Sequence, residues 1–167
     1  MKCLWCLTGG EYLLAESMEV LKRQSGATVA VSTAGLEVVS MYGLLDELKG
    51  AADDIVLEGT HGRSAPIIMM LRSYDVVVVA PCSANTAAKI AHGIADSLVT
   101  NIVSQALKSC VKVVVLPTDA EPEVTGKTVS GKDVRIRCRR VDLENVERLK
   151  QEMVVVRNKT ELENALS

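Results

Sequence analysis

Residues 74–101 read YDVVVVAPCSANTAAKIAHGIADSLVTN, and the rest of the chain is organised around this stretch. Its apolar run, residues 76–80, is too short for a core helix and is typical of a strand buried on both faces. Pro81 has no N–H to donate, so we expect the strand to end there. A polar turn and an Ala-rich helical pattern follow. The stretch therefore predicts a strand, turn and helix of the kind that builds parallel sheets.

The polar turn after this strand carries the chemistry of a ligand site. Ser83, Asn85 and Thr86 offer two hydroxyls and an amide, and the start of the helix offers free backbone N–H groups. In open α/β sheets, ligands bind outside the carboxyl ends of the strands, which is where this turn lies. An ordinary turn capped by Ser83 or Asn85 would use the same residue types, so both interpretations stay open.

The same stretch resembles the PASANT signature of the FMN-binding flavoproteins related to the cysteine decarboxylases. Cys82 stands where the signature has Ala, and the matching positions are Ser83, Ala84, Asn85, Thr86, Lys89, Gly93, Ile94, Asp96 and Leu98. The likeness covers most of residues 1–118 and is nearest to the archaeoflavoproteins, small FMN proteins associated with ferredoxin-linked electron transfer. It implies FMN as the cofactor. It also implies a homo-oligomer, a trimer or a dodecamer of trimers, with FMN at the subunit interface.

Two earlier turns complete the predicted site. Residues 2–7 form an expected strand that ends in Thr8-Gly9-Gly10, where glycines allow close approach of a ligand. The pattern is not G-x-G-x-x-G, so a dinucleotide site is poorly supported. After the strand at residues 27–31, Ser32 and Thr33 place two hydroxyls at a helix start, which suits a terminal phosphate or a simple helix cap. The family likeness favours phosphate contact.

These turns define the residues that we predict to bind FMN. We assign no catalytic residue and no metal ligand. The predicted cofactor-binding residues are Thr8, Gly9, Gly10, Glu11, Ser32, Thr33, Ser83, Ala84, Asn85, Thr86 and Thr118.

Strands alternate with helices along the chain, which predicts a three-layer α/β/α, Rossmann-like (flavodoxin-like) fold with a largely parallel sheet. We expect one FMN-binding domain over residues 1–167, in which residues 127–167 form a C-terminal extension packed on the rest. The expected strands are 2–7, 27–31, 55–57, 76–80, 111–116 and 153–156, and the expected helices are 11–24, 36–49, 67–72, 86–109 (one helix or two), 141–151 and 159–166.

Composition narrows the classes of function. A net charge of −2 argues against general nucleic-acid binding, and apolar runs of strand length predict no membrane span. Five scattered cysteines favour a reduced, cytoplasmic protein. Cys3 and Cys6 form a C-x-x-C, but residues three apart on a strand point to opposite faces, so buried small hydrophobes are favoured over a redox pair.

The sequence lacks the decarboxylase machinery of the family that it resembles. The catalytic His of those enzymes stands fourteen residues before the Pro of the signature, a position held here by Ile67, and His61 comes six residues earlier. Their Pro-x-Met-Asn substrate clamp is replaced by PTDAEPEVTG at residues 117–126. We therefore predict an electron-transfer flavoprotein that accepts electrons from ferredoxin. The alternatives are an FMN-dependent reductase of a pterin-like substrate, a cysteine-type decarboxylase and a non-catalytic flavin store.

Two further segments carry expectations. Met69 and Met70 are expected in the core. Residues 126–140 alternate basic and apolar side chains, which predicts a strand with one basic face. That face is either a solvated surface or a docking surface for an acidic ferredoxin. Its basic residues, opposed only by Asp133, are Lys127, Lys132, Arg135, Arg137, Arg139 and Arg140.

Overall fold

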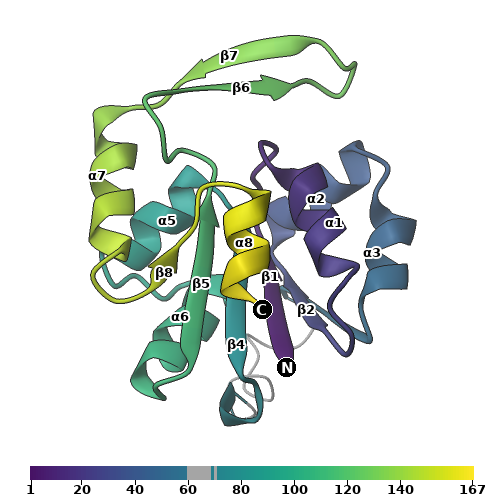
Figure 1. Cartoon of the computed structure of the whole chain (residues 1–167), viewed down its shortest axis with the longest axis vertical. Coiled ribbons are helices and arrows are strands. Elements are labelled where there is room, and N and C mark those ends of the chain that lie inside the picture. The colour runs from purple at the N-terminus through teal and green to yellow at the C-terminus, as the bar shows by residue number, and fades with distance from the viewer. Residues whose placement is uncertain (60–68, 70) are drawn as a thin grey trace.

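The computed structural model describes residues 1–59, 69 and 71–167, and its centre is a six-stranded sheet (Figure 1). The strand order is β3-β2-β1-β4-β5-β8, and each pair of neighbours is parallel. This confirms the predicted parallel sheet. The strands are β1 (Cys3–Leu7), β2 (Thr28–Val31), β3 (Asp54–Leu57), β4 (Val76–Cys82), β5 (Lys112–Pro117) and β8 (Val154–Val155).

Helices cover both faces of the sheet, so the predicted three layers are confirmed. One core lies under α1 (Leu14–Leu21), α2 (Thr33–Met41), α3 (Leu45–Ala51) and α8 (Lys159–Ala165). The other lies under η2 (Leu71–Ser73), α5 (Ala84–Ala91), α6 (Leu98–Lys108) and α7 (Arg140–Leu149). Apolar side chains on both faces explain why the strands are almost continuously hydrophobic.

The first strand shows how the two cores divide. Cys3 and Trp5 pack in the first core, whereas Leu4 and Cys6 pack in the second. All four are fully buried, as the alternation of a strand requires. Burial raises the pKa of Cys3 to about 12. The two cysteines therefore lie on opposite faces as small hydrophobes and form no redox pair.

The structure corrects several expected boundaries. Pro81 does not end its strand, because β4 continues to Cys82 through an irregularity in its pairing with β5 between Val79 and Cys82. The helix expected over residues 36–49 is two helices, α2 and α3, separated by a turn in which Gly43 has a φ of +69°. The region 86–109 also forms two helices, α5 and α6, the second of the two forms expected.

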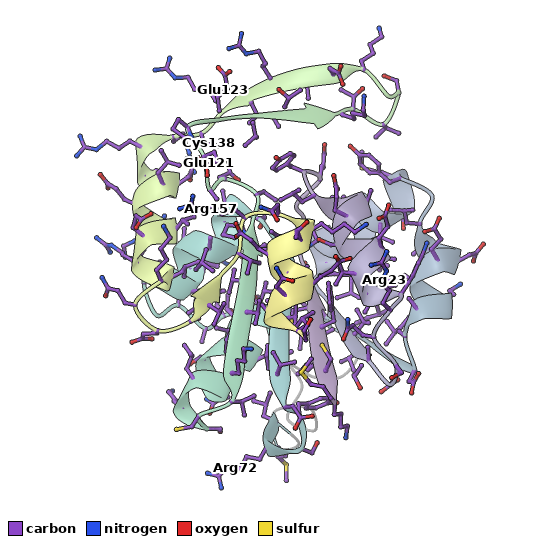
Figure 2. The ribbon with its side chains drawn as sticks, in the orientation of Figure 1. Arg23, Arg72, Glu121, Glu123, Cys138 and Arg157 are labelled. Atoms are coloured by element: carbon purple, nitrogen blue, oxygen red, sulfur yellow. The ribbon has the colours of Figure 1, made fainter. Side chains whose placement is uncertain are left out.

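A β-hairpin projects from the layered body. The predicted basic strand is β7 (Asp133–Arg137), and it pairs antiparallel with β6 (Glu123–Lys127) in a separate two-stranded sheet. Figure 1 shows this hairpin lying across the end of the molecule at which β1 and β4 finish. At its base, the Arg157 guanidinium lies 3.6 Å from the Glu121 carboxylate, which ties the hairpin to the segment after β8 (Figure 2).

Some predictions concern residues in or next to the ranges that the structure does not describe. His61, Ile67 and Met70 lie outside the described residues. Met69 is 84% exposed, so its predicted place in the core is wrong for this chain. No helix among the described residues combines the length and the apolar character needed to cross a membrane.

Gly35 and Gly50 provide a matched test of the packing of α2 on β1. A Cβ on Gly35 would lie 2.7 Å from the carbonyl oxygen of Leu7, which is backbone and must shift, whereas a Cβ on Gly50 would meet nothing within 4 Å. We expect Gly35→Ala to lower the free energy of unfolding by about 1–3 kcal/mol. Gly50→Ala, in helix α3, should raise it by up to about 1 kcal/mol. Urea unfolding midpoints measure both, and equal midpoints for the two variants would contradict this packing.

Candidate nucleotide-binding site

The candidate site lies at the carboxyl ends of β1 and β4. These neighbours are the point at which the strand order reverses, and the crevice there is where doubly wound sheets bind nucleotides. The buried Thr8 hydroxyl joins the two strand ends. It donates to the carbonyl oxygen of Pro81 at 2.8 Å and accepts from the N–H of Ser83 at 2.8 Å. The first and third predicted turns are therefore fixed against each other.

Close packing at the glycines brings in the other turns. A Cβ on Gly9 would lie 2.8 Å from the Cβ of Ala34, and a Cβ on Gly10 would lie 2.6 Å from Cγ2 of Thr118. The N–H of Thr118 donates to the carbonyl oxygen of Cys82 at 2.9 Å. Packing within the chain therefore requires glycine at both positions, with or without a ligand. The three predicted turns and the predicted residue Thr118 therefore meet at one edge of the sheet.

The third turn serves both as a cap and as an open donor surface. Ser83 caps α5, since its hydroxyl oxygen accepts from the N–H of Thr86 at 3.3 Å. The N–H groups of Ala84 and Asn85 lie in the first turn, where no intrahelical acceptor exists. The exposed Asn85 amide makes no hydrogen bond in the described part of the chain. Cys82, by contrast, is fully buried in the core.

The second turn is partly occupied by a side chain that sequence reasoning missed. Ser32 caps α2 by accepting from the N–H of Gly35 at 3.0 Å, which leaves its own hydroxyl hydrogen available. Thr33 donates both its N–H (2.9 Å) and its hydroxyl (3.1 Å) to Oε2 of Glu58. The other carboxylate oxygen, Oε1, accepts from the N–H of Leu98 at 2.7 Å. Glu58 therefore caps α2 and α6 together, and Thr33 is engaged where a phosphate was predicted.

The charge of Glu58 is stabilised by these donors. Burial opposes the charged form, but the N–H groups of Thr33 and Leu98 and the Thr33 hydroxyl outweigh it, so the pKa of Glu58 is lowered. The only sequence signal for this residue was its position, an acid directly after a strand.

A second carboxylate at this edge was also missed. Asp119 directly follows Thr118 at the end of β5, and the Thr118 hydroxyl donates to its Oδ2 at 2.5 Å. Burial and then the neighbouring Asp119 raise the pKa of Cys138 to about 11, so this thiol stays protonated. Asp119 therefore links the end of β5 to the base of the hairpin, where Cys138 lies (Figure 2).

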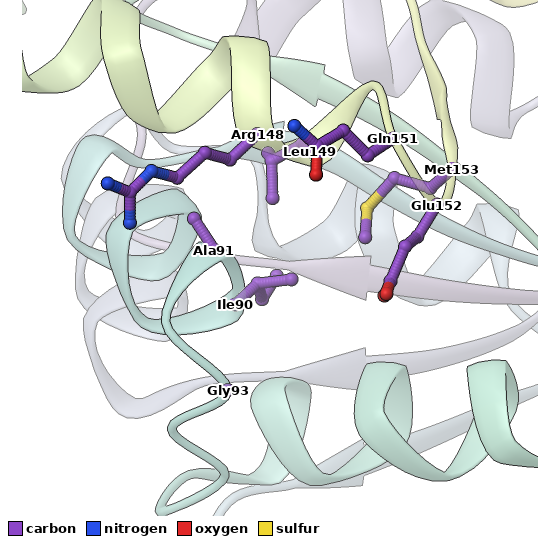
Figure 3. A pocket seen from close by; sticks show the side chains of 8 residues that line it. All are labelled: Ile90, Ala91, Gly93, Arg148, Leu149, Gln151, Glu152 and Met153. Atoms are coloured by element: carbon purple, nitrogen blue, oxygen red, sulfur yellow. The ribbon is translucent and has the colours of Figure 1, made fainter.

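Two polar side chains of the helix that follows this turn, Lys89 and His92, have partners within the chain. Lys89 pairs with Asp96, with both carboxylate oxygens 2.9 Å from Nζ. His92 is exposed, and its Nε2 lies 3.1 Å from Oδ1 of Asn145 in α7. A hollow of about 450 Å³ beside them is lined by Ile90, Arg148 and Met153 among others (Figure 3). It contains none of the predicted site residues.

The residues present fit a mononucleotide with a phosphate and a polar chain. The Ser32 hydroxyl and the first-turn N–H groups of α5 are donors suited to phosphate or ribityl oxygens. The exposed, unbonded amide of Asn85 can both donate and accept. A parallel sheet in this strand order, with polar turns at its switch point, is the architecture of nucleotide-binding α/β proteins.

The chain belongs to the flavoprotein family, whose sequence model matches residues 1–164. It is 43% identical over 132 residues to the dihydromethanopterin reductase (acceptor) of Methanocaldococcus jannaschii, covering 71% of this chain and 54% of that protein. The reductase of the same name from Methanosarcina mazei is 39% identical over 133 residues, covering 72% of this chain and 56% of that protein. The chain thus spans little more than half the length of these curated relatives.

A solved structure resembles nearly the whole chain. It is Burkholderia xenovorans DmrB in complex with FMN, described as a cubic protein cage for redox transfer. The TM-score is 0.87 at 34% sequence identity, over 99% of this chain and 92% of that chain. The flavoprotein family predicted from the turn at residues 82–86 is therefore confirmed. The predicted cofactor, FMN, is the ligand of that related structure.

Replacing Glu58 with Gln tests the double cap. We expect Glu58→Gln to lower the free energy of unfolding at pH 7 by about 1 kcal/mol, as other cap substitutions do. Because the folded-state pKa of Glu58 is depressed, its contribution is full above the unfolded pKa of about 4.3 and is lost as the pH falls through the folded value. The gap between wild type and variant should therefore close in acid. Urea unfolding at a series of pH values measures it, and a pH-independent gap would exclude this role.

Proposed function

We propose that this chain, as one domain over residues 1–167, is an FMN-dependent reductase that acts on a pterin-like substrate. The observation that carries the proposal is the 43% identity to a dihydromethanopterin reductase, over a segment that covers 71% of the chain. Likeness to the FMN complex of DmrB extends over 99% of the chain and supports the same chemistry. Because the chain spans only 54% of that reductase, the substrate is part of the proposal.

FMN is the cofactor, and bound FMN supplies hydride or single-electron transfer. In our proposal, the Ser32 hydroxyl donates to the phosphate, and the first-turn N–H groups of α5 donate to the phosphate or ribityl chain. The Asn85 amide contacts the ribityl chain or the ring edge. In the same proposal, Gly9 and Gly10 let the backbone of the first turn approach the phosphate closely.

The protein also sets the polarity around the reacting atoms. Reduction of a C=N bond adds a hydride and a proton, so an acid near the ring matters. Three carboxylates lie at or beside this edge. Glu58 is committed to the N–H groups of Thr33 and Leu98, whereas Glu11 is exposed. The Asp119 carboxylate accepts from the Thr118 hydroxyl and from the Cys138 thiol. Of these three carboxylates, Glu11 is therefore the one most open to a substrate.

The five cysteines are free and four of them are buried, which supports the reducing, cytoplasmic setting that their odd number predicts.

We also propose a homo-oligomer, because DmrB is described as a cubic cage and because Met41, Met69 and Ile94 are exposed in the single chain. Light scattering measures the assembly, and a monomeric mass would rule it out.

The test of the reductase uses the purified protein loaded with FMN. We expect a flavin spectrum, release of FMN identified by mass, and oxidation of the chemically reduced flavin when an anaerobic dihydropterin is added. A protein that takes up no FMN would overturn the site. A flavin that stays reduced in the presence of the dihydropterin would overturn the reductase alone.

Electron transfer from an acidic ferredoxin is the second candidate. The hairpin region offers fewer unpaired basic side chains for docking than the sequence predicted. Four of the six basic residues predicted for residues 126–140 form ion pairs within the chain, so Asp133 is not the only acid that neutralises them. Lys132 and Arg137 form no ion pair within the described residues. The pairs are Lys127–Asp133 (2.7 Å), Arg135–Glu123 (2.5 Å), Arg139–Asp142 (2.7 Å) and Arg140–Glu144 (2.7 Å).

Charge reversal at Arg137 tests this docking surface. If an acidic donor approaches here, Arg137→Glu should slow flavin reduction by reduced ferredoxin about 3–10-fold at low salt, and the difference should vanish at high salt. Arg139 is unsuitable as a probe because its guanidinium is paired with the buried Asp142. Stopped-flow absorbance measures the rate, with Arg72→Glu as the control, because Arg72 is exposed and lies at the opposite end of the molecule from the hairpin in Figure 2. Equal slowing in both variants would place docking elsewhere.

A further inference from the structure

A cleft of about 380 Å³ lies between the hairpin and the start of the chain's first helix. Its walls come from the segment before α1, from the end of α2 and from the underside of β6. Among the residues that line it are Glu11, Tyr12, Tyr42, Gly126, Lys127 and Asp133. Glu11 directly follows Gly10, so this cleft opens beside the first turn of the candidate FMN site. Its size is in the range of small-molecule sites.

The cleft gathers the accessible aromatic side chains of the protein. The sequence contains one Trp, three Tyr and no Phe. Trp5 and Tyr74 are buried, at 0% and 6% exposure, whereas Tyr12 and Tyr42 are partly exposed and both line the cleft. A flat ring gains most from contact with other rings. In a chain so poor in aromatics, this is the surface best suited to receive one.

The hairpin supplies an apolar roof. In the β6–β7 register Val124 faces Ile136 and Gly126 faces Val134, so the side chains of Val124, Val134 and Ile136 lie on the same face as Gly126. A Cβ on Gly126 would lie 3.7 Å from Cδ2 of Tyr12, so this face of the hairpin is turned toward the Tyr12 ring. The absence of a side chain at Gly126 keeps the space beside the ring open.

One carboxylate in the cleft is held in place. The Tyr42 hydroxyl lies 3.2 Å from Oε2 of Glu11 and 3.0 Å from the carbonyl oxygen of Lys127, so it can donate to either. Burial and then the neighbouring Glu11 raise the pKa of Tyr42, which keeps this hydroxyl protonated. Oε1 of Glu11 has no partner in the described part of the chain, so it can accept from a ligand.

The charges around the cleft are mainly negative. Glu11, Glu16 and Asp133 line it, and Lys127 is the cation on the same wall. Since Lys127 pairs with Asp133 at 2.7 Å, two carboxylates remain uncompensated. Such a cleft favours a ring rich in N–H donors and disfavours an anion.

We propose that this cleft is the substrate pocket, in which the N–H edge of a pterin ring donates to Glu11 while the ring lies against Tyr12 beneath the hairpin. The 2-amino group and the adjacent ring N–H of a pterin are two parallel donors, a match for a carboxylate. This assigns Glu11 to the substrate rather than to FMN. It rests on the proposed function, because that function supplies the pterin.

The experiment compares Glu11→Gln and Tyr42→Phe with wild type, all loaded with FMN. Glu37→Gln is the matched control, since Glu37 is an exposed acid of α2 that does not line the cleft. Calorimetry with a dihydropterin gives its dissociation constant, flavin fluorescence gives that of FMN, and turnover gives KM and kcat. Glu11→Gln should weaken pterin binding about 10–100-fold, the loss expected for a hydrogen bond to a charged group, and raise KM alike. Tyr42→Phe should act in the same direction by a smaller factor. FMN affinity should not change in either.

Unchanged pterin affinity in Glu11→Gln overturns the pocket even if the wild type reduces pterins. Equal weakening of FMN and pterin also overturns it, because the flavin would then occupy the cleft. A wild type that binds the dihydropterin tightly without reducing it, and loses that binding in Glu11→Gln, supports the pocket and refutes the reductase.

Discussion

The buried hydroxyl of Thr8 is the contact on which the site depends. It donates to the carbonyl oxygen of Pro81 and accepts from the N–H of Ser83, so its hydrogen and one lone pair are both used. Unpaired backbone groups at this depth would each cost about 1–3 kcal/mol. The contact fixes the ends of β1 and β4 at the point where the strand order reverses. The turns that follow both strands therefore take their positions from it.

Close packing extends this constraint to the neighbouring strands. Gly9 admits Ala34 from the start of α2, and Gly10 admits Thr118 from the end of β5. The order β3-β2-β1-β4-β5-β8 thus places four polar turns side by side at one edge. The hairpin then adds a roof over one side of this edge. A site for a nucleotide and a site for a second flat molecule can share the same wall because Glu11 follows Gly10 directly.

Patterns within single segments predicted most of the fold. A strand that is buried on both faces of a parallel sheet is apolar along most of its length, and β4 shows this pattern in its sequence. The turn at Ser83–Thr86 also followed from local sequence. Contacts between distant residues could not be predicted in this way. Glu58 meets Leu98 forty positions later, and Arg135 meets Glu123 only because a hairpin forms. Met69 was misplaced because an apolar residue in a short segment carries no signal of the face it occupies. The hydrogen bond between Tyr42 and Glu11 could not be predicted either, because the two residues are 31 positions apart in the sequence.

The double cap by Glu58 has a mechanical consequence. Helix α2 belongs to the layer on one face of the sheet and α6 to the layer on the other, yet one carboxylate holds the first turn of each. The two layers are therefore joined at the edge of the sheet by the hydrogen bonds of one carboxylate, in addition to the contacts within the two cores. The position of the α2 turn and that of the start of α6 are therefore set by the same side chain. Loss of this one carboxylate would loosen helix starts on both faces of the sheet at once.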